Sequence, residues 1–494
     1  MSMKDKAETR QLTENLQQIG KALDQYLKYE HPDALHPSAN WRSILNEPVP
    51  FKGAGLEQVV SLLTEQIIPN GSAVSKPTFT SYITTGGTTA ATLAATSANI
   101  ASPQRYMQTA FNFLEGLALE WLAQMFGLKG MQGLFSSGGS VANLVALGGA
   151  RQHAFEQIGI DPAAEGVSKS VVIYASSECH HTIQRAAGVL GLGRRCVRSI
   201  DIDYAGRLNF DSLKKALEQD LAEGKLPIAI VANAGTTNRG AIDPIKQMGQ
   251  LAKAHNIWFH IDGAYGLPGV LDERLAKKYE GLEYADSIIV DPHKWLGAAI
   301  GVGATFVKDR SFLARAFTQE PADYLEGTVD QSVEASNVAT VTSEHSMDHF
   351  GTPYFDYGVE LSSPSRGVVV WAMLKEIGVE GMRERIKRHN DMATELAQRV
   401  TAHQNLELLG EPELSICCFR YTSSKIKDLD AFNQKLHRQL IRGNIHLPST
   451  TRVNGALAIR PCFIGARTEA EHGRALVDAV LAIGDAMINS AQPL

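Results

Sequence analysis

Residues 286–297, DSIIVDPHKWLG, decide the fold of this chain. The β-branched and small residues at 287–290 predict a short buried strand, and Pro292 ends that strand because it cannot donate a ladder hydrogen bond. Lys294 therefore follows the carboxyl end of the strand, where open α/β sheets form their ligand crevices. A lysine beside apolar neighbours such as Trp295 loses its proton readily and can form a Schiff base with a carbonyl. Taken alone, the stretch is also compatible with a solvated loop lysine.

A second apolar strand lies upstream, in residues 257–266, IWFHIDGAYG, and ends in Asp262. A carboxylate at the end of a buried strand is costly unless it meets a positive charge. The pyridinium nitrogen of pyridoxal phosphate (PLP) is such a partner, and keeping it protonated makes the ring an electron sink. Gly263 and Ala264 are small enough to let a flat ring lie against the backbone. The alternatives are an aspartate that caps a helix or binds a metal.

A third segment, residues 134–151, has the sequence LFSSGGSVANLVALGGAR. The pattern predicts a strand end, a Ser/Gly turn and then a helix. Bare backbone amides at a helix N-terminus bind phosphate well. The segment is not a Walker A loop, because no Gly-Lys-Ser/Thr follows. A Ser/Gly turn that only caps a helix is the alternative.

Histidines form two clusters that we considered as metal ligands. In residues 175–193, ASSECHHTIQRAAGVLGLG, His180 or His181 leaves a strand end where an imidazole can stack on a cofactor ring. Cys179 precedes this pair, but no second Cys/His pair lies at zinc-site spacing. His345 and His349 are four apart, yet HSMDH lacks the glutamate of a zinc protease motif. We therefore expect no metal.

Five motifs in this order resemble the PLP-dependent group II amino-acid decarboxylases: SSGGSVAN, SECHHTIQRA, NAGTTNRGAIDPI, HIDGAYG and DPHKWLG. That group includes aromatic amino-acid, histidine, glutamate and aspartate decarboxylases, and the resemblance runs from about residue 77 to the C-terminus. It implies fold-type I of the PLP enzymes and an obligate homodimer. It also implies roles for nine residues: Schiff-base lysine (Lys294), pyridinium partner (Asp262), ring-stacking histidine (His180), packing against the other ring face (Ala264), phosphate binding (Gly138, Gly139, Ser140, His293) and cofactor contact (Thr237).

Two further positions, Asp291 and Tyr82, were compared with the family pattern. Asp291 stands where animal members carry an asparagine that helps to bind phosphate; since a carboxylate repels phosphate, we expect Asp291 to point elsewhere or to bond a backbone amide. Tyr82, in the segment 76–86, KPTFTSYITTG, matches the substrate side of the family. Aromatic-type members carry a tyrosine there, which favours a substrate other than glutamate. A merely packed Tyr82 is equally compatible.

Composition places the chain among soluble enzymes. It has 494 residues, 44% of them hydrophobic and 20% charged, with a net charge of −6, which gives no reason to expect nucleic acid. Residues 1–21 have no apolar core of a signal peptide, and no run approaches the roughly 18 apolar residues of a membrane span. The five cysteines are scattered and odd in number. We expect a cytoplasmic protein without a membrane partner.

The order of elements predicts three parts. Residues 1–90 show amphipathic helices and form an arm that must dock on the body or on a partner subunit. In 91–366 short apolar strands alternate with helices, which predicts a large PLP-binding α/β domain with a mainly parallel sheet. Residues 367–494, with two leading helices, strands in 413–421 and 455–463 and a last helix, form a smaller α+β domain.

The predicted reaction converts an L-amino acid into its amine and carbon dioxide. Residues 318–356 are long, polar and poorly periodic, and resemble the mobile loop of the family. Tyr324 in this loop is the expected proton donor to the α-carbon, with Tyr354 as the second choice, although both can simply pack at the loop ends. The alternatives are another PLP lyase, an aminotransferase, an aldehyde-forming enzyme, and an inactive homologue that binds or scaffolds. An aminotransferase would use Arg460 for the substrate carboxylate.

Overall fold

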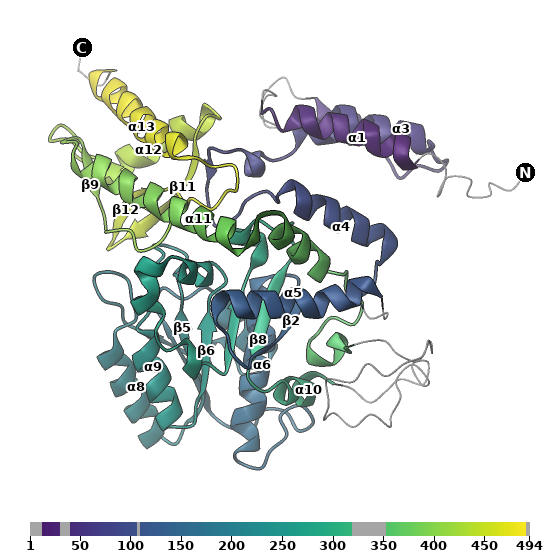
Figure 1. Ribbon diagram of the computed structural model, residues 1–494. Coiled ribbons are helices and arrows are strands. Elements are labelled where there is room, and N and C mark those ends of the chain that lie inside the picture. Colours follow the sequence, from purple (N-terminus) through teal and green to yellow (C-terminus); the bar gives the residue numbers. More distant parts are fainter. Residues whose placement is uncertain (1–11, 30–39, 106–108, 319–351, 491–494) are drawn as a thin grey trace, which may run out of the picture.

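The computed structural model describes residues 12–29, 40–105, 109–318 and 352–490 (Figure 1). Its larger sheet has the strand order β2-β8-β7-β6-β5-β3-β4. The strands are β2 (Gln132–Ser136), β3 (Val171–Ser176), β4 (Val197–Ile200), β5 (Leu226–Asn233), β6 (Trp258–Asp262), β7 (Ser287–Val290) and β8 (Gly303–Val307). Strands β7, β6, β5, β3 and β4 are parallel neighbours, whereas β8 runs antiparallel to both β7 and β2. The predicted mainly parallel sheet is therefore confirmed.

Helices cover this sheet, and strands β3, β6, β7 and β8 are buried along their whole length. The helices of this region are α4 (Thr89–Ala101), α5 (Ala110–Phe126), α6 (Gly139–Glu156), α7 (Thr182–Val189), α8 (Phe210–Ala222), α9 (Ile245–Ala254) and α10 (Ser311–Phe317). Helix α6 packs across β5, β6, β7 and β8, while α9 packs on β5 and β6. Short helical turns complete the connections: η4 (Arg194–Cys196), η5 (Leu267–Leu271), η6 (Glu273–Tyr279), η7 (Leu282–Tyr284), η8 (Pro292–Leu296) and η10 (Tyr354–Tyr357).

A smaller sheet has the order β1-β11-β12-β10-β9 and a hydrophobic cluster of its own. Its strands are β1 (Phe79–Thr80), β9 (Leu406–Leu408), β10 (Phe419–Tyr421), β11 (Leu447–Val453) and β12 (Ala456–Arg460), and its helices are α11 (Gly367–Thr401), α12 (Leu429–Arg442) and α13 (Ala470–Ser490). Gly378 interrupts α11 with φ +68°, which divides it into the two predicted helices. Strand β1, from the predicted arm, pairs parallel to β11 and so connects that segment to the small sheet.

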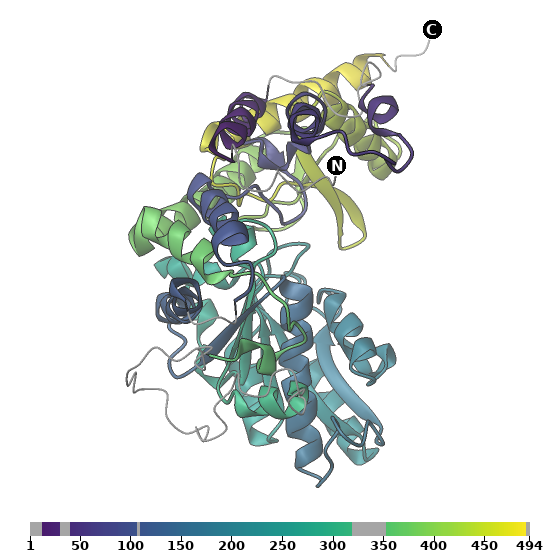
Figure 2. The same ribbon diagram turned by 90° about the vertical axis from the view of Figure 1, so that its right-hand side faces the viewer.

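The N-terminal arm consists of α1 (Leu12–Tyr26), α2 (Trp41–Leu45), α3 (Leu56–Leu62) and the turns η1 (Leu63–Ile67), η2 (Ile68–Asn70) and η3 (Ala73–Ser75). Figure 1 shows α1 and α3 side by side, and Figure 2 shows the arm and the small sheet at the opposite end of the molecule from α8 and α9. No residue of α1 is buried, although Leu12, Leu16 and Leu23 are apolar. Among the described residues, no helix has the length and apolar character needed to cross a membrane.

Candidate functional site

A cavity of about 320 Å³ opens at the carboxyl ends of β2, β3, β5, β6 and β7. This is the edge of the sheet at which ligands of open α/β folds bind. All nine residues predicted to contact a cofactor line the cavity: Gly138, Gly139, Ser140, His180, Thr237, Asp262, Ala264, His293 and Lys294. The sheet topology therefore brings together residues that are more than 150 positions apart in the chain.

A wider depression of about 550 Å³ lies elsewhere, around the beginnings of α8 and α9. It contains none of the nine predicted residues. Two of its cations are paired: Arg207 lies 2.9 Å from Asp203, and Lys246 lies 3.0 Å from Glu280. The smaller cavity is therefore the better candidate for chemistry.

Lys294 lies in η8, directly after β7, as its sequence position predicted. Its backbone departs from helical values, with φ −94° and ψ −109°, so the turn is bent at this residue. The amine Nζ lies 2.9 Å from Asp291 Oδ2. Trp295, the next residue, is fully buried and stacks on Tyr265 with ring centroids 5.1 Å apart. This packing fixes the turn that carries the amine.

Asp262 ends β6 and is 7% exposed. Its Oδ1 accepts the backbone N–H of Ala264 (3.1 Å), and its Oδ2 accepts Nδ2–H of Asn143 (3.0 Å). A buried carboxylate needs such donors. Asn143 also accepts, through Oδ1, a bond of 2.8 Å from His260 Nε2. Burial lowers the pKa of His260 to about 4, so its ring is neutral. A chain of hydrogen bonds thus runs from His260 through Asn143 to Asp262.

His180 follows β3 and faces the same cavity. Its Nδ1 lies 2.9 Å from Thr182 Oγ1, and Thr182 Oγ1 accepts Nδ2–H of Asn143 at 3.0 Å. Because the backbone N–H of Thr182 also donates to His180 Nδ1 (3.4 Å), this nitrogen is an acceptor and the Thr182 hydroxyl donates its proton to it. Burial lowers the pKa of His180, which favours a neutral ring, the form suited to stacking on an aromatic cofactor. Asn143 therefore links the predicted stacking histidine to the predicted pyridinium partner.

The end of the cavity that the sequence predicts to bind phosphate is built from the turn before α6 and from His293. Gly138 has φ +140°, and a Cβ placed there would lie 3.0 Å from His293 Cε1, so the turn requires glycine. The first amides of α6 have no partners within the helix and can bind an anion. His293 Nδ1 donates to the Val302 carbonyl at 2.6 Å, and burial lowers the pKa of this histidine. Its Nε2 is therefore the free position of a neutral ring.

The expectation that Asp291 points away from this end is wrong. Asp291 is 2% exposed, lines the cavity and directs Oδ2 toward Lys294. The backbone N–H of Asp291 donates to the Ala264 carbonyl, which fixes the residue at the end of β7. The side chain turns inward because the Lys294 ammonium offers the opposite charge that a buried carboxylate needs.

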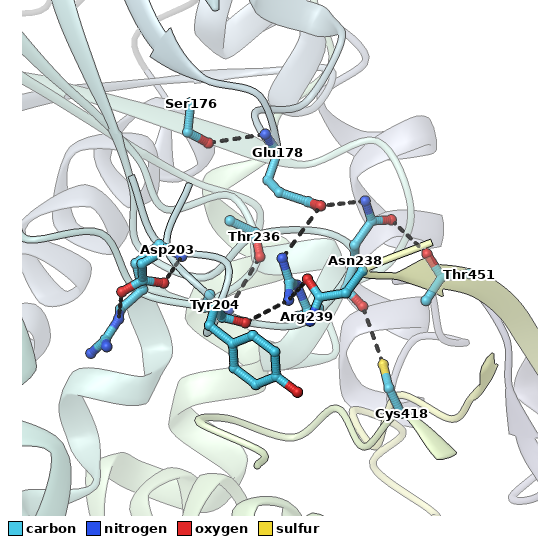
Figure 3. A network of polar contacts seen from close by, with 12 residues as sticks. Ser176, Glu178, Asp203, Tyr204, Thr236, Asn238, Arg239, Cys418 and Thr451 are labelled. Carbon is cyan, nitrogen blue, oxygen red and sulfur yellow. Dashed lines mark hydrogen bonds and ion pairs between the residues drawn. The ribbon is translucent and has the colours of Figure 1, made fainter. Parts of the chain in front are cut away.

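The loop that carries Thr237 connects the two parts of the molecule. Asn238 Nδ2 donates to Glu178 Oε2 (2.6 Å), and Thr451 Oγ1 donates to Asn238 Oδ1 (3.0 Å), as Figure 3 shows. Arg460 donates to the carbonyls of Thr237 and Asn238 and to that of Tyr82 (2.8 Å). Arg460 is 3% exposed, and its guanidinium donates to backbone carbonyls. It is therefore not free to bind a substrate carboxylate.

The remaining predicted residues lie apart from the cavity or outside the described residues. The Tyr82 side chain is 68% exposed, does not line the cavity and has φ +56°; its substrate role stays a prediction. Tyr324, His345 and His349 fall outside the described residues. Tyr354 is 4% exposed beneath the Arg105 guanidinium, and burial raises its pKa to about 12, as suits a packed anchor.

The residues present fit PLP. The cavity has one end rich in free amides and an opposite group, Asp262, that accepts hydrogen bonds. Ala264 also lines the cavity, and its small side chain, which packs with the buried Ala142, Ala146 and Ile289, leaves room for a flat ring. In the described part of the chain, no group of three metal-binding side chains is found.

Comparison with known proteins gives one family and several relatives. The family model described as "Pyridoxal-dependent decarboxylase conserved domain" matches residues 38–422. An aromatic-L-amino-acid decarboxylase of Bacillus atrophaeus is 29% identical over 437 residues, covering 87% of this chain and 86% of the relative. A phenylacetaldehyde synthase of Petunia hybrida is 26% identical over 440 residues, covering 84% and 82%.

Solved structures share the fold. The structure of Oryza sativa TDC with PLP and tryptamine superposes with a TM-score of 0.86 at 22% identity, covering 98% of this chain and 99% of that one. At this identity the likeness shows the fold alone. It confirms the predicted fold-type I architecture, with its large, mainly parallel sheet.

Proposed function

Because the chain belongs to the pyridoxal-dependent decarboxylase family, we propose that it converts an L-amino acid into its amine and carbon dioxide, with PLP attached covalently to Lys294. PLP is the cofactor of this family, and its ring supplies an electron sink for the bond that breaks. One observation carries the assignment to these residues: a single cavity contains the Lys294 amine, the Asp262 carboxylate and the amides of the α6 turn.

Each residue has a role that follows from its contacts. Asp262, held by Ala264 and Asn143, accepts a hydrogen bond and keeps a ring nitrogen protonated. His180 and Ala264 both line the cavity, and they would pack against the two faces of the cofactor ring. Gly138, Gly139, Ser140 and His293 hold the phosphate, and Thr237 contacts the cofactor from the β5 side. Tyr324 returns the proton to the α-carbon, a role proposed from the sequence alone.

An aldehyde is the second candidate product. The relative from Petunia hybrida is named phenylacetaldehyde synthase, so a similar sequence can be associated with another outcome. An amine requires that a proton be added to the α-carbon, whereas an aldehyde requires that the carbon–nitrogen bond be oxidised, with molecular oxygen as the oxidant, and that ammonia be released. We assign the proton-adding step to Tyr324 from the sequence alone. An aminotransferase is disfavoured, because the carboxylate-binding arginine that it would need, Arg460, is occupied by backbone carbonyls. An inactive scaffold protein is disfavoured by the intact set of cavity residues.

A homodimer is the assembly that we propose. The apolar residues Leu12, Leu16 and Leu23 of α1 remain 39–48% exposed in the single chain. A second copy of the chain would cover this face. For localisation we propose the cytoplasm, because all five cysteines are free thiols, as a reducing compartment requires.

The product distribution tests the proposal. The protein, supplied with PLP, is incubated with each amino acid, and carbon dioxide, amine, aldehyde and keto acid are measured together. Carbon dioxide with an equal amount of amine supports the decarboxylase. Carbon dioxide with aldehyde supports the second candidate, and keto acid without carbon dioxide would contradict both. Sedimentation at the assay concentration tests the dimer, which an active monomer would exclude.

A further inference from the structure

The carboxylate of Asp291 lies at the phosphate end of the cavity and is only partly satisfied. Its Oδ2 pairs with Lys294 Nζ at 2.9 Å, but its Oδ1, although buried, has no hydrogen-bond partner. A Cβ placed on Gly139 would lie 2.7 Å from Asp291 Oδ2, and one on Gly303 would lie 2.8 Å from Oδ1. The carboxylate is therefore packed against the turn whose amides are proposed to bind phosphate.

If PLP binds as proposed, its phosphate and the Asp291 carboxylate would be two neighbouring negative groups. A phosphate carries about −1.5 to −2 charges at pH 7, and charges a few ångströms apart repel strongly where water is excluded. Lys294 is the nearest cation to Asp291 in the described part of the chain, since His293 Nε2 lies 3.9 Å away on a ring whose pKa burial lowers. Lys294 is also the group that is proposed to bond to the cofactor, so it is not available only to neutralise the charge of the Asp291 carboxylate.

We propose that Asp291 is a cofactor-site residue that weakens the hold on the phosphate group and thereby makes PLP exchangeable. This inference rests on the proposed function, because it needs PLP in this cavity. Asp291 opposes the phosphate, whereas the α6 turn and His293 bind it. Occupancy of the enzyme then follows the supply of free PLP more closely than it would with a neutral residue at this position.

Two ligands separate this effect from an effect on Lys294. PLP carries the phosphate, and pyridoxal has the same ring and aldehyde without it. The dissociation constants of both are measured by fluorescence titration of the cofactor-free protein, for the natural chain and for Asp291→Asn, which keeps the shape of the side chain. Asp286→Asn, at the residue just before β7 and outside the cavity, is the matched control.

The expected result is that Asp291→Asn tightens PLP binding about tenfold or more and changes pyridoxal binding less than about threefold, with Asp286→Asn unchanged for both. An equal change for both ligands would overturn the proposal, because Asp291 would then act only through Lys294. A selective loss of PLP affinity would overturn it as well, because the carboxyl group would then hold the phosphate. If the natural protein binds neither ligand, the proposed function itself fails.

Discussion

The Asn143 side-chain amide donates to Asp262 Oδ2 at 3.0 Å and accepts from His260 Nε2 at 2.8 Å. The Asn143 amide thus orients the Asp262 carboxylate. Its third partner is Thr182, whose hydroxyl oxygen accepts a hydrogen bond from Asn143. An amide that bonds three buried groups cannot be replaced by a smaller side chain without leaving them unpaired.

Asn143→Ala should lower turnover about tenfold or more, shift the absorbance of the bound cofactor and cost about 1–3 kcal/mol of stability. Asn390→Ala is the matched control, because Asn390 also donates to a buried aspartate, Asp272, but outside the cavity. The control should lose stability and keep its spectrum. If both variants show the natural spectrum and turnover, Asn143 has only a structural role.

Lys294→Ala should abolish turnover while the protein remains folded and still binds PLP without a covalent bond. The amine performs the covalent chemistry, whereas phosphate contacts and Asp262 provide much of the affinity. Borohydride treatment followed by mass spectrometry checks the bond: the natural protein and the exposed control Lys129→Ala should retain the cofactor, and Lys294→Ala should not. Retention of the cofactor by Lys294→Ala would assign the bond to another lysine.

The site residues that could be predicted from the sequence are those that follow apolar strand patterns. The apolar run 257–261 is followed directly by Asp262, and the run 287–290 is followed four residues later by Lys294. Because ligands bind at the carboxyl edge of such sheets, both residues are expected there. Asn143 was missed because it lies within a helical pattern, where it is bonded by residues from β6 and α7 that no spacing rule connects. Asp291 was misjudged because repulsion by a phosphate was weighed without the Lys294 ammonium.

The small sheet was less predictable. Strands β10 and β12 follow apolar patterns, but β11, LPSTTRV, contains proline and four polar or charged residues, and β1 has two residues. Their pairing depends on tertiary context, since β1 lies more than 360 positions from β11 in the chain. In the cavity, by contrast, the positions of all nine predicted residues followed from the motifs.

Asp262→Asn should reduce turnover about a hundredfold or more while leaving the folded state intact. The amide no longer keeps a ring nitrogen protonated, so the electron sink weakens. Asp272→Asn, at another buried aspartate, is the control and should keep the natural turnover. Turnover and the cofactor spectrum are measured for each variant. An Asp262→Asn enzyme that is unchanged in both would show that Asp262 serves a different group.

The stability should fall on acidification in part through His389. Burial lowers the pKa of His389 to about 3, and Trp295 Nε1 donates to its Nδ1 at 3.0 Å. Between about pH 6.5 and pH 3 the unfolded chain binds a proton that the folded chain refuses, so the free energy of unfolding decreases as pH falls. Asp243, whose pKa burial raises to about 6, contributes with the opposite sign.

The variant His389→Gln isolates this contribution. Between pH 7 and pH 5 the natural protein should lose about 2 kcal/mol more than the variant, measured by urea unfolding at each pH. His255→Gln, at an exposed position, should lose as much as the natural protein. Equal pH dependence of the natural protein and His389→Gln would mean that His389 does not contribute to the acid sensitivity.

Tyr324→Phe should slow amine formation or divert the intermediate to aldehyde while leaving PLP binding intact. The phenol is the proposed source of the proton that returns to the α-carbon, a role that rests on the sequence alone. Tyr354→Phe is the matched control, because Tyr354 is packed under Arg105 away from the cavity. Amine and aldehyde are measured together with carbon dioxide, so that decarboxylation and protonation are separated. If Tyr324→Phe releases carbon dioxide at the natural rate with amine as its sole product, the proton comes from another group.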